Sequence, residues 1–241
     1  MKILAIGDVH GRMDWMKYGD ISSLINGTSQ TPAYDKYVFL GDYVDSYELN
    51  NAHILSTLKK LVDFKDKFPD NVVLLLGNHD VQYLMPITHK RSRCSGFNVV
   101  LYYDLYDVFT RVSSYFHVVY QVNNYLFSHG GIHDAWLNNV LKYDESSGLT
   151  ISDAVNDAFS CNDDSIYYCG YKRGGFNIVG GPLWCDKSEI KKAPVKGYHH
   201  VVGHSKVDGI TKVFPYNGDA NTSVTFCDCM EVCDAFVEID V

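Results

Sequence analysis

Five short apolar runs in this chain end in polar residues flanked by glycine, and this pattern constrains the fold most. Each run has the length and composition of a buried strand. The five runs are residues 2–6, 36–40, 71–76, 125–128 and 199–202. They lead into the sequences GDVHG, GDYVD, GNHD, HGG and GHS. Because α/β sheets bind ligands beyond the carboxyl ends of their strands, we expect these polar groups to meet at one edge.

The segments between and after these runs predict a mixed α/β domain. Residues 48–68 carry apolar side chains at spacings of three and four, which is typical of an amphipathic helix. Parallel strands are expected in the first half and antiparallel ones in the second, with Asn123-Asn124 as a tight hairpin. Further helices are expected at 99–115, 133–142 and 150–160, and further strands at 117–122, 210–214, 223–227 and 235–241. We expect residues 1–241 to form a single domain.

The composition excludes several classes of protein. Hydrophobic residues are 46% of the chain and charged residues 21%, which is ordinary globular usage. The net charge of −8 disfavours binding to extended nucleic acid. The apolar run before Gly7 is too short for a secretory signal, and no run is long enough for a membrane span.

The seven cysteines indicate a reducing compartment, so a cytoplasmic location is expected. Their number is odd and their spacing irregular, which fits free thiols better than a disulfide framework. Cys227, Cys229 and Cys233 are either three zinc ligands or interior residues of a β segment. The second interpretation is favoured, because no histidine or paired cysteine nearby completes a tetrahedral site.

The polar residues at the strand ends form a set typical of a metal centre. Any one Gly-Asp or Gly-Asn pair is more often a turn, but five of them after strand-like runs favour metal ligands. Two carboxylates, one amide and three imidazoles suit Mn²⁺, Fe or Zn²⁺. Six ligands are too many for one catalytic ion, and they suit two ions about 3.5–4 Å apart. The candidates are Asp8, His10, Asp42, Asn78, His129 and His204.

Taken together, these motifs resemble the calcineurin-like metallophosphoesterase superfamily. More narrowly, they resemble its phosphoprotein-phosphatase branch, which includes bacterial and phage serine/threonine phosphatases and diadenosine tetraphosphatases. The resemblance extends from Gly7 to Ser205. It implies a four-layer α-β-β-α sandwich of two mixed sheets, with a dimetal site at the strand ends and Mn²⁺ as the expected metal.

The resemblance also implies a role for each site residue. Asp8, His10 and Asp42 would hold one ion, and Asp42, Asn78, His129 and His204 the other. His79 would be the catalytic acid, oriented by Asp45. A metal-bridging hydroxide would attack phosphorus directly, and His79 would give its proton to the departing oxygen.

The chain departs from the phosphatase branch at two positions where that branch usually has arginine. These positions hold Ser46 and Leu76. Because a bidentate arginine is the natural clamp for a phosphoryl group, another arginine is expected to replace them. Arg12 and Arg173 are the candidate substrate-binding residues. The sequence does not indicate whether residues 86–98 or residues 161–197 form a lid.

The sequence is therefore compatible with three functions. The first is a metal-dependent serine/threonine phosphoprotein phosphatase, whose substrate is a phosphorylated protein or a small phosphate ester. The second is a nucleotide phosphodiesterase or pyrophosphatase, such as a dinucleoside tetraphosphate hydrolase. The third is a scaffold without catalysis, which is disfavoured because all six ligands, His79 and Asp45 are present. No membrane partner is expected, and the oligomeric state is open.

Overall fold

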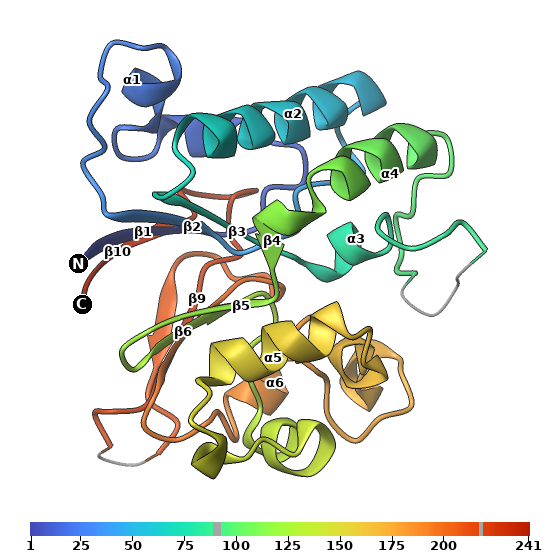
Figure 1. Cartoon of the computed structure of the whole chain (residues 1–241), viewed down its shortest axis with the longest axis vertical. Coiled ribbons are helices and arrows are strands. Elements are labelled where there is room, and N and C mark those ends of the chain that lie inside the picture. Colours follow the sequence, from blue (N-terminus) through green and yellow to red (C-terminus); the bar gives the residue numbers. More distant parts are fainter. Residues whose placement is uncertain (89–92, 217–218) are drawn as a thin grey trace.

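Two five-stranded sheets form the centre of the protein (Figure 1). The computed structural model describes residues 1–88, 93–216 and 219–241. In order across the first sheet, the strands are β10 (Phe236–Asp240), β1 (Lys2–Ile6), β2 (Lys36–Phe39), β3 (Val72–Leu75) and β4 (Phe116–His117). Across the second they are β5 (Val119–Val122), β6 (Tyr125–Ser128), β7 (His199–Val202), β9 (Ser223–Phe226) and β8 (Thr211–Val213).

Helices cover the outer face of each sheet, which confirms the expected four-layer sandwich. Figure 1 shows α2 and α4 over the first sheet and α5 and α6 over the second. The α-helices are α1 (Ile21–Ile25), α2 (Asn51–Lys67), α3 (Asn78–Val81), α4 (Tyr102–Arg111), α5 (Ile151–Ser160) and α6 (Lys187–Ile190). Short 3₁₀ turns lie at Asp14–Lys17, Ser113–Tyr115, Glu145–Ser147, Asp164–Tyr167 and Tyr171–Arg173, and a π-helical turn at Trp136–Leu141.

The longest helix, α2, follows directly from its sequence. The side chain of Asn50 accepts a hydrogen bond from the backbone N–H of His53 at 2.9 Å, which caps the helix. Ile54, Leu58 and Leu61 form its buried face. Burying each of these side chains contributes about 1.5–3 kcal/mol to holding α2 against the first sheet.

The inner faces of the two sheets pack through a thin apolar layer. Val38 and Leu75 from the first sheet belong to the same buried cluster as Phe127 and Val201 from the second. This layer fixes the sheets against each other, so the ends of β2 and β6 are held at a constant separation.

The single strand expected at 117–122 is wrong, because the chain passes there from one sheet to the other. β4 ends at His117 in the first sheet, and β5 begins at Val119 in the second. The side-chain oxygen of Asn156, on α5, accepts the N–H groups of Val118 at 2.8 Å and Val119 at 3.2 Å. A side chain thus replaces the strand partner that these N–H groups lack at the crossing.

The expectation of antiparallel strands in the second half is wrong for the centre of the second sheet. β6 pairs with β7 and β7 with β9 in parallel, and the antiparallel pairs lie at the sheet edges. The Asn123 hairpin between β5 and β6 is confirmed, with φ of 50° at Asn123. The parallel pairing matters for function, because it brings the carboxyl ends of β6 and β7 to the same edge.

Candidate metal centre

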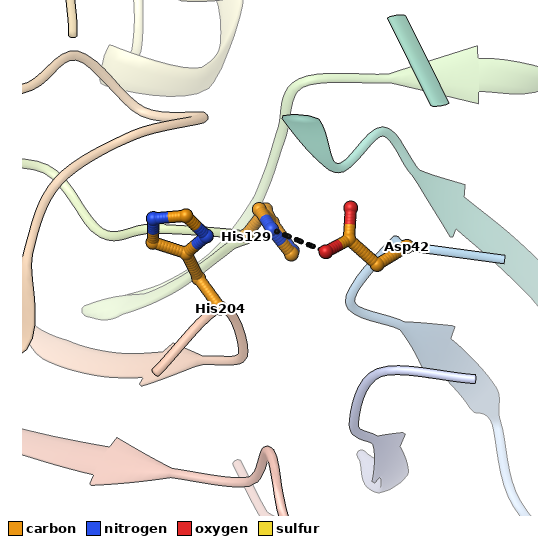
Figure 2. Close-up of side chains that lie close together, drawn as sticks. All are labelled: Asp42, His129 and His204. Carbon is orange, nitrogen blue, oxygen red and sulfur yellow. Dashed lines mark ion pairs between the residues drawn. The ribbon is translucent and has the colours of Figure 1, made fainter. Parts of the chain in front are cut away.

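Two clusters of possible metal ligands lie side by side and share Asp42. Asp8, His10 and Asp42 form one cluster, and Asp42, His129 and His204 form the other. Within each cluster, one ligand atom from every residue lies within 4.8 Å of the others. Figure 2 shows His129 and His204 facing the Asp42 carboxylate from the opposite side of the site. The structure therefore brings the expected ligands together.

The hydrogen bonds of His10 leave one ring nitrogen free for a cation. Its Nδ1 lies 2.8 Å from the carbonyl oxygen of Asp45 and 3.1 Å from that of Val44, so Nδ1 carries the hydrogen. Its Nε2 faces Oδ2 of Asp42 at 3.7 Å. The lone pair on Nε2 of His10 and the carboxylate of Asp42 repel each other. A cation between them would turn this repulsion into binding.

His129 has the same arrangement in a fully buried position. Its Nδ1 donates to the carbonyl oxygen of Leu40 at 2.9 Å. Its Nε2 lies 2.9 Å from Oδ1 of Asn78 and 3.3 Å from Oδ2 of Asp42, so it faces two acceptors. A metal ion placed between these groups could bind this nitrogen together with the oxygens of Asn78 and Asp42.

His204 also has a ring nitrogen that is available to a cation, so these residues fit two cations. Its Nε2 is buried and has no hydrogen-bond partner among the described residues. Burial, His129 and Arg173 together hold the pKa of His204 well below its ordinary value, so the ring is neutral and its lone pair can bind a metal. A buried nitrogen without a partner is costly unless a ligand satisfies it.

The backbone around the centre is held in an unusual conformation. Among the described residues, seven other than glycine have positive φ, and four of them belong to the site: His10, Asp42, Asp45 and His204. Left-handed backbone at such residues costs on the order of 1–3 kcal/mol and is typical of functional sites.

Two glycines allow the carboxylates to approach the backbone. A Cβ at Gly77 would lie 2.1 Å from Oδ1 of Asp42, and a Cβ at Gly203 would lie 1.9 Å from Oδ1 of Asp8. The backbone N–H of His204 donates to both oxygens of Asp8, at 3.1 and 3.0 Å. Glycine is therefore required for the packing of the ligands, and not only for the turns that the sequence suggested.

Crowded negative charge makes the centre attractive to cations. Burial raises the pKa of Asp8 well above its ordinary value, and the charges of Asp228 and Asp42 raise it further. Burial opposes ionisation of Asp42 as well, but His129 and His79 hold its pKa well below the ordinary value. A divalent cation would stabilise all of these carboxylates in the charged form.

His79 lies beside the two clusters and is oriented by Asp45. Its Nδ1 donates to Oδ2 of Asp45 at 2.9 Å. Burial lowers the pKa of His79, but the charge of Asp42 and the bond to Asp45 raise it to about 12. Tyr83 donates to Oδ1 of Asp45 at 2.5 Å, and the Gln82 side-chain nitrogen donates to Oδ2. His79 therefore carries a proton at neutral pH and is held in a fixed orientation.

Several supporting residues were missed by reasoning from the sequence. Asp80 is fully buried and accepts the backbone N–H groups of Asp42, Tyr43 and Gly77 at 2.7, 2.8 and 2.8 Å. It fixes the turn that presents Asp42, and its place in GNHD was the only available signal. Asp228, buried after β9, also faces the site, and nothing in its local sequence indicated this.

The comparisons with known proteins agree with this geometry. The family model described as calcineurin-like phosphoesterase matches residues 1–222. The chain belongs to this family. The match confirms the resemblance that the motifs predicted.

Relatives of the calcineurin-like phosphoesterase domain include a Schizosaccharomyces pombe protein that bears the name of a serine/threonine-protein phosphatase. It is 30% identical over 113 residues, which are 45% of this chain and 34% of that protein. The chain thus matches about a third of the length of this curated relative.

Two solved structures show the same fold. A mutant of a cold-active protein tyrosine phosphatase matches with a TM-score of 0.58 and 17% identity, over 99% of this chain and 75% of that one. The cold-active protein-tyrosine phosphatase of a psychrophilic Shewanella species matches with a TM-score of 0.53 and 19% identity, over 95% of this chain and 71% of that one.

A cavity of about 1350 Å³ opens over the centre of this phosphoesterase domain. Four of the expected ligands line it, together with part of the segment 161–197: His10, Asp42, Asn78 and His204. Residues 89–92, within the other segment that could form a lid, 86–98, lie outside the described residues. Across the part of the chain that the structure covers, no helix has the length and apolar character needed to cross a membrane.

The two candidate arginines differ in their positions. Arg173 lines the cavity, pairs with Asp186 at 2.9 Å and donates to Oγ of Ser205 at 2.5 Å, next to His204. Arg12 is not part of the cavity wall, and its guanidinium pairs with Glu48 at 2.8 Å and Glu231 at 3.7 Å. Of these two arginines, only Arg173 therefore lines the cavity over the centre.

The two positions that lack the family arginine also differ. Ser46 lines the cavity, whereas Leu76 is fully buried in the core. An arginine at the second position would need a different local packing.

The three cysteines near the C-terminus all have free thiols. Cys227 and Cys229 are buried, and Cys233 is exposed.

Proposed function

We propose that this chain is a metal-dependent phosphoester hydrolase and, more specifically, a serine/threonine phosphoprotein phosphatase. The observation that carries this proposal is the position of Asp42 between two groups of histidine and aspartate ligands. A carboxylate shared in this way is the arrangement needed to hold two ions together.

The ligands divide as the family resemblance implies. Asp8, His10 and Asp42 would hold one divalent ion, and Asn78, His129 and His204 would hold the other together with Asp42. Mn²⁺ is proposed as the metal, with Fe and Zn²⁺ as alternatives, because the donors are oxygen and nitrogen. Once bound, the ions would make a water acidic enough to act as a nucleophile near neutral pH and would neutralise charge on the phosphoryl oxygens.

The remaining steps depend on side chains of the chain itself. His79 holds a proton beside the site and would donate it to the oxygen that leaves phosphorus. Asp45 keeps the ring oriented and favours its charged form. Arg173 would bind the phosphoryl oxygens from the cavity wall, where Ser205 and Asp186 hold its guanidinium in place. Arg12 is the weaker candidate for this role, since it does not line the cavity.

A nucleotide hydrolase is the second candidate, and the volume of the cavity favours it. At about 1350 Å³ the cavity exceeds the volume that a phosphorylated side chain fills. Tyr47, Tyr168, Phe176 and Trp184 line it, and Phe176 is 90% exposed. Such aromatic faces can stack on nucleobases, although they bind peptide side chains equally well.

The test is turnover of a generic aryl phosphate by purified protein with Mn²⁺. We expect turnover that a chelator abolishes and that His79→Ala reduces strongly. A panel of phosphoserine and phosphothreonine peptides, phosphotyrosine peptides and diadenosine tetraphosphate then identifies the substrate class. Absence of metal-dependent turnover on all of these esters would exclude both enzyme proposals and favour the scaffold.

We also propose that the protein acts in the cytoplasm on phosphorylated proteins or small phosphate esters. All seven cysteines have free thiols, which suits a reducing compartment. The net charge of −8 opposes binding of long nucleic acids, while two divalent ions would bring positive charge to the cavity alone. Substrates with one or a few phosphates are therefore favoured.

A further inference from the structure

A third group of possible metal ligands lies in the cavity and shares no residue with the two clusters around Asp42. It consists of Asp45, His79 and Cys94, with one ligand atom from each within 4.8 Å of the others. All three side chains line the cavity, so a dissolved ion can reach them. Cys94 lies on the loop after α3, and its backbone N–H donates to the side-chain oxygen of Gln82 at 3.2 Å.

We propose that Asp45, His79 and Cys94 form an inhibitory zinc site. One thiolate, one imidazole and one carboxylate make a typical three-residue zinc set, which leaves the fourth tetrahedral position for water. The sulfur ligand gives the site a different preference from the Asp42 centre. Mn²⁺ favours oxygen ligands and competes weakly for a thiolate, so Mn²⁺ in the Asp42 centre and Zn²⁺ at Cys94 are compatible.

The charges of the three side chains and the hydrogen bonds around Asp45 favour zinc binding at this position. The Asp45 carboxylate and a Cys94 thiolate carry two negative charges, which match one Zn²⁺, and binding releases the thiol proton and a proton of His79. Tyr83 and Gln82 already orient Asp45 by hydrogen bonds. The ring of His79 lies 5.2 Å from that of His10, between centroids, so the ion would adjoin the Asp42 centre without using its ligands.

Zinc at this position would stop catalysis by occupying the proposed acid. Zinc would replace one of the two protons of the charged ring, so the neutral imidazole that remains would no longer be an effective acid. The ion would also obstruct the approach of substrate to His79. This consequence rests on the proposed phosphoesterase function, whereas the binding of the metal does not. Zinc binding and inhibition can therefore be tested separately.

The binding test uses Co²⁺ as a spectroscopic probe added to the purified protein. Thiolate ligation to Co²⁺ gives a charge-transfer band in the near ultraviolet, and the ligands around Asp42 include no sulfur. We expect this band in the unmodified protein and its loss in Cys94→Ser. Cys169→Ser is the matched control, because Cys169 lines the same cavity but belongs to none of the three clusters. Absence of the band in the unmodified protein, or its persistence in Cys94→Ser, would overturn the proposal.

The inhibition test measures turnover of an aryl phosphate with saturating Mn²⁺ and increasing Zn²⁺. Cys94→Ser and Cys94→Ala should keep the basal rate and need at least tenfold more Zn²⁺ for half inhibition, while Cys169→Ser behaves as the unmodified protein. Equal sensitivity of all four proteins would refute inhibition through Cys94. If no substrate is turned over, the Co²⁺ band still decides whether the site exists.

Discussion

Oδ2 of Asp42 lies 3.3 Å from Nε2 of His129, and this contact joins the two sheets across the edge where their strands end. Asp42 follows β2 in the first sheet, and His129 follows β6 in the second. The other nitrogen of His129 donates to Leu40, also in the first sheet. A metal ion held here therefore binds both sheets at once.

Metal binding is accordingly expected to stabilise the fold. A ligand that binds only the native state at 100 times its Kd raises the free energy of unfolding by about 2.7 kcal/mol. We expect Mn²⁺ to raise the urea midpoint of the metal-free protein and chelator to reverse this. Asp42→Asn should abolish the increase. An equal increase in Asp42→Asn would mean that Mn²⁺ stabilises the protein at some other position.

His79→Ala should lower kcat by about 10²- to 10⁴-fold, which is the usual contribution of a positioned general acid. KM should change little, and the bound metal should be unaffected, because His79 is outside both clusters around Asp42. Steady-state kinetics and metal analysis of the same preparation check both expectations. His117→Ala is a suitable control, since His117 is exposed. A kcat within threefold of the unmodified value in His79→Ala would exclude the proposed acid.

Tyr83→Phe tests whether the orientation of Asp45 matters. The substitution removes the hydroxyl that donates to Oδ1 of Asp45 at 2.5 Å and leaves the ring in place. A lost hydrogen bond to a charged group costs about 1.5–3 kcal/mol, and part of that loss should appear as a three- to tenfold lower kcat. KM should stay constant, because Tyr83 does not line the cavity. An unchanged kcat would show that the hydroxyl of Tyr83 does not support catalysis.

Arg173→Ala should raise KM for phosphate esters by about 10- to 100-fold, the equivalent of one lost charge-assisted contact. Arg12→Ala should raise KM less than threefold, because Arg12 does not line the cavity and its guanidinium faces Glu48 and Glu231. Arg173→Lys separates charge from geometry and should recover only part of the loss. Kinetics on an aryl phosphate measure all three. The reverse order of effects would make Arg12 the substrate clamp.

The buried His200 should make the protein sensitive to mild acid. Burial lowers its pKa from 6.5 to about 4, and its Nδ1 has no partner among the described residues. The unfolded chain therefore binds a proton between these pH values while the native chain does not, so this stabilisation is present above pH 6.5 and is lost as the pH falls to about 4. The loss amounts to about 3 kcal/mol, since one pKa unit is about 1.4 kcal/mol.

Urea unfolding at several pH values, with chelator present, measures this effect. His200→Gln keeps a donor for the carbonyl oxygen of Val195 but cannot titrate, so its stability should fall less between pH 6.5 and 4. Parallel pH dependence in the two proteins would assign the acid sensitivity to other groups.

The strands and their polar ends were predictable because both signals are local. Residues 2–6 match β1, and the residues after β1, β2, β3, β6 and β7 supply all six expected ligands. The glycines in these motifs could be recognised from sequence, but their purpose could not. Gly77 and Gly203 are required by the carboxylates of Asp42 and Asp8, which come from distant parts of the chain.

The two wrong predictions concern which segments pair, and pairing is not set by local sequence. Nothing in residues 117–122 marks the change of sheet, because the groups that replace the strand partner come from Asn156 on α5. The direction of β7 and β9 depends on how the segments before them cross the sheet. The partners of Arg12 and the buried position of Asp228 are likewise tertiary features.

The most direct test of the shared-carboxylate centre is the number of Mn²⁺ ions bound per chain at saturation. Equilibrium dialysis followed by elemental analysis should give two ions for the unmodified protein and for His79→Ala, and fewer than one for Asp42→Asn with a native circular dichroism spectrum. A single ion in the unmodified protein, or two ions retained by Asp42→Asn, would contradict the account.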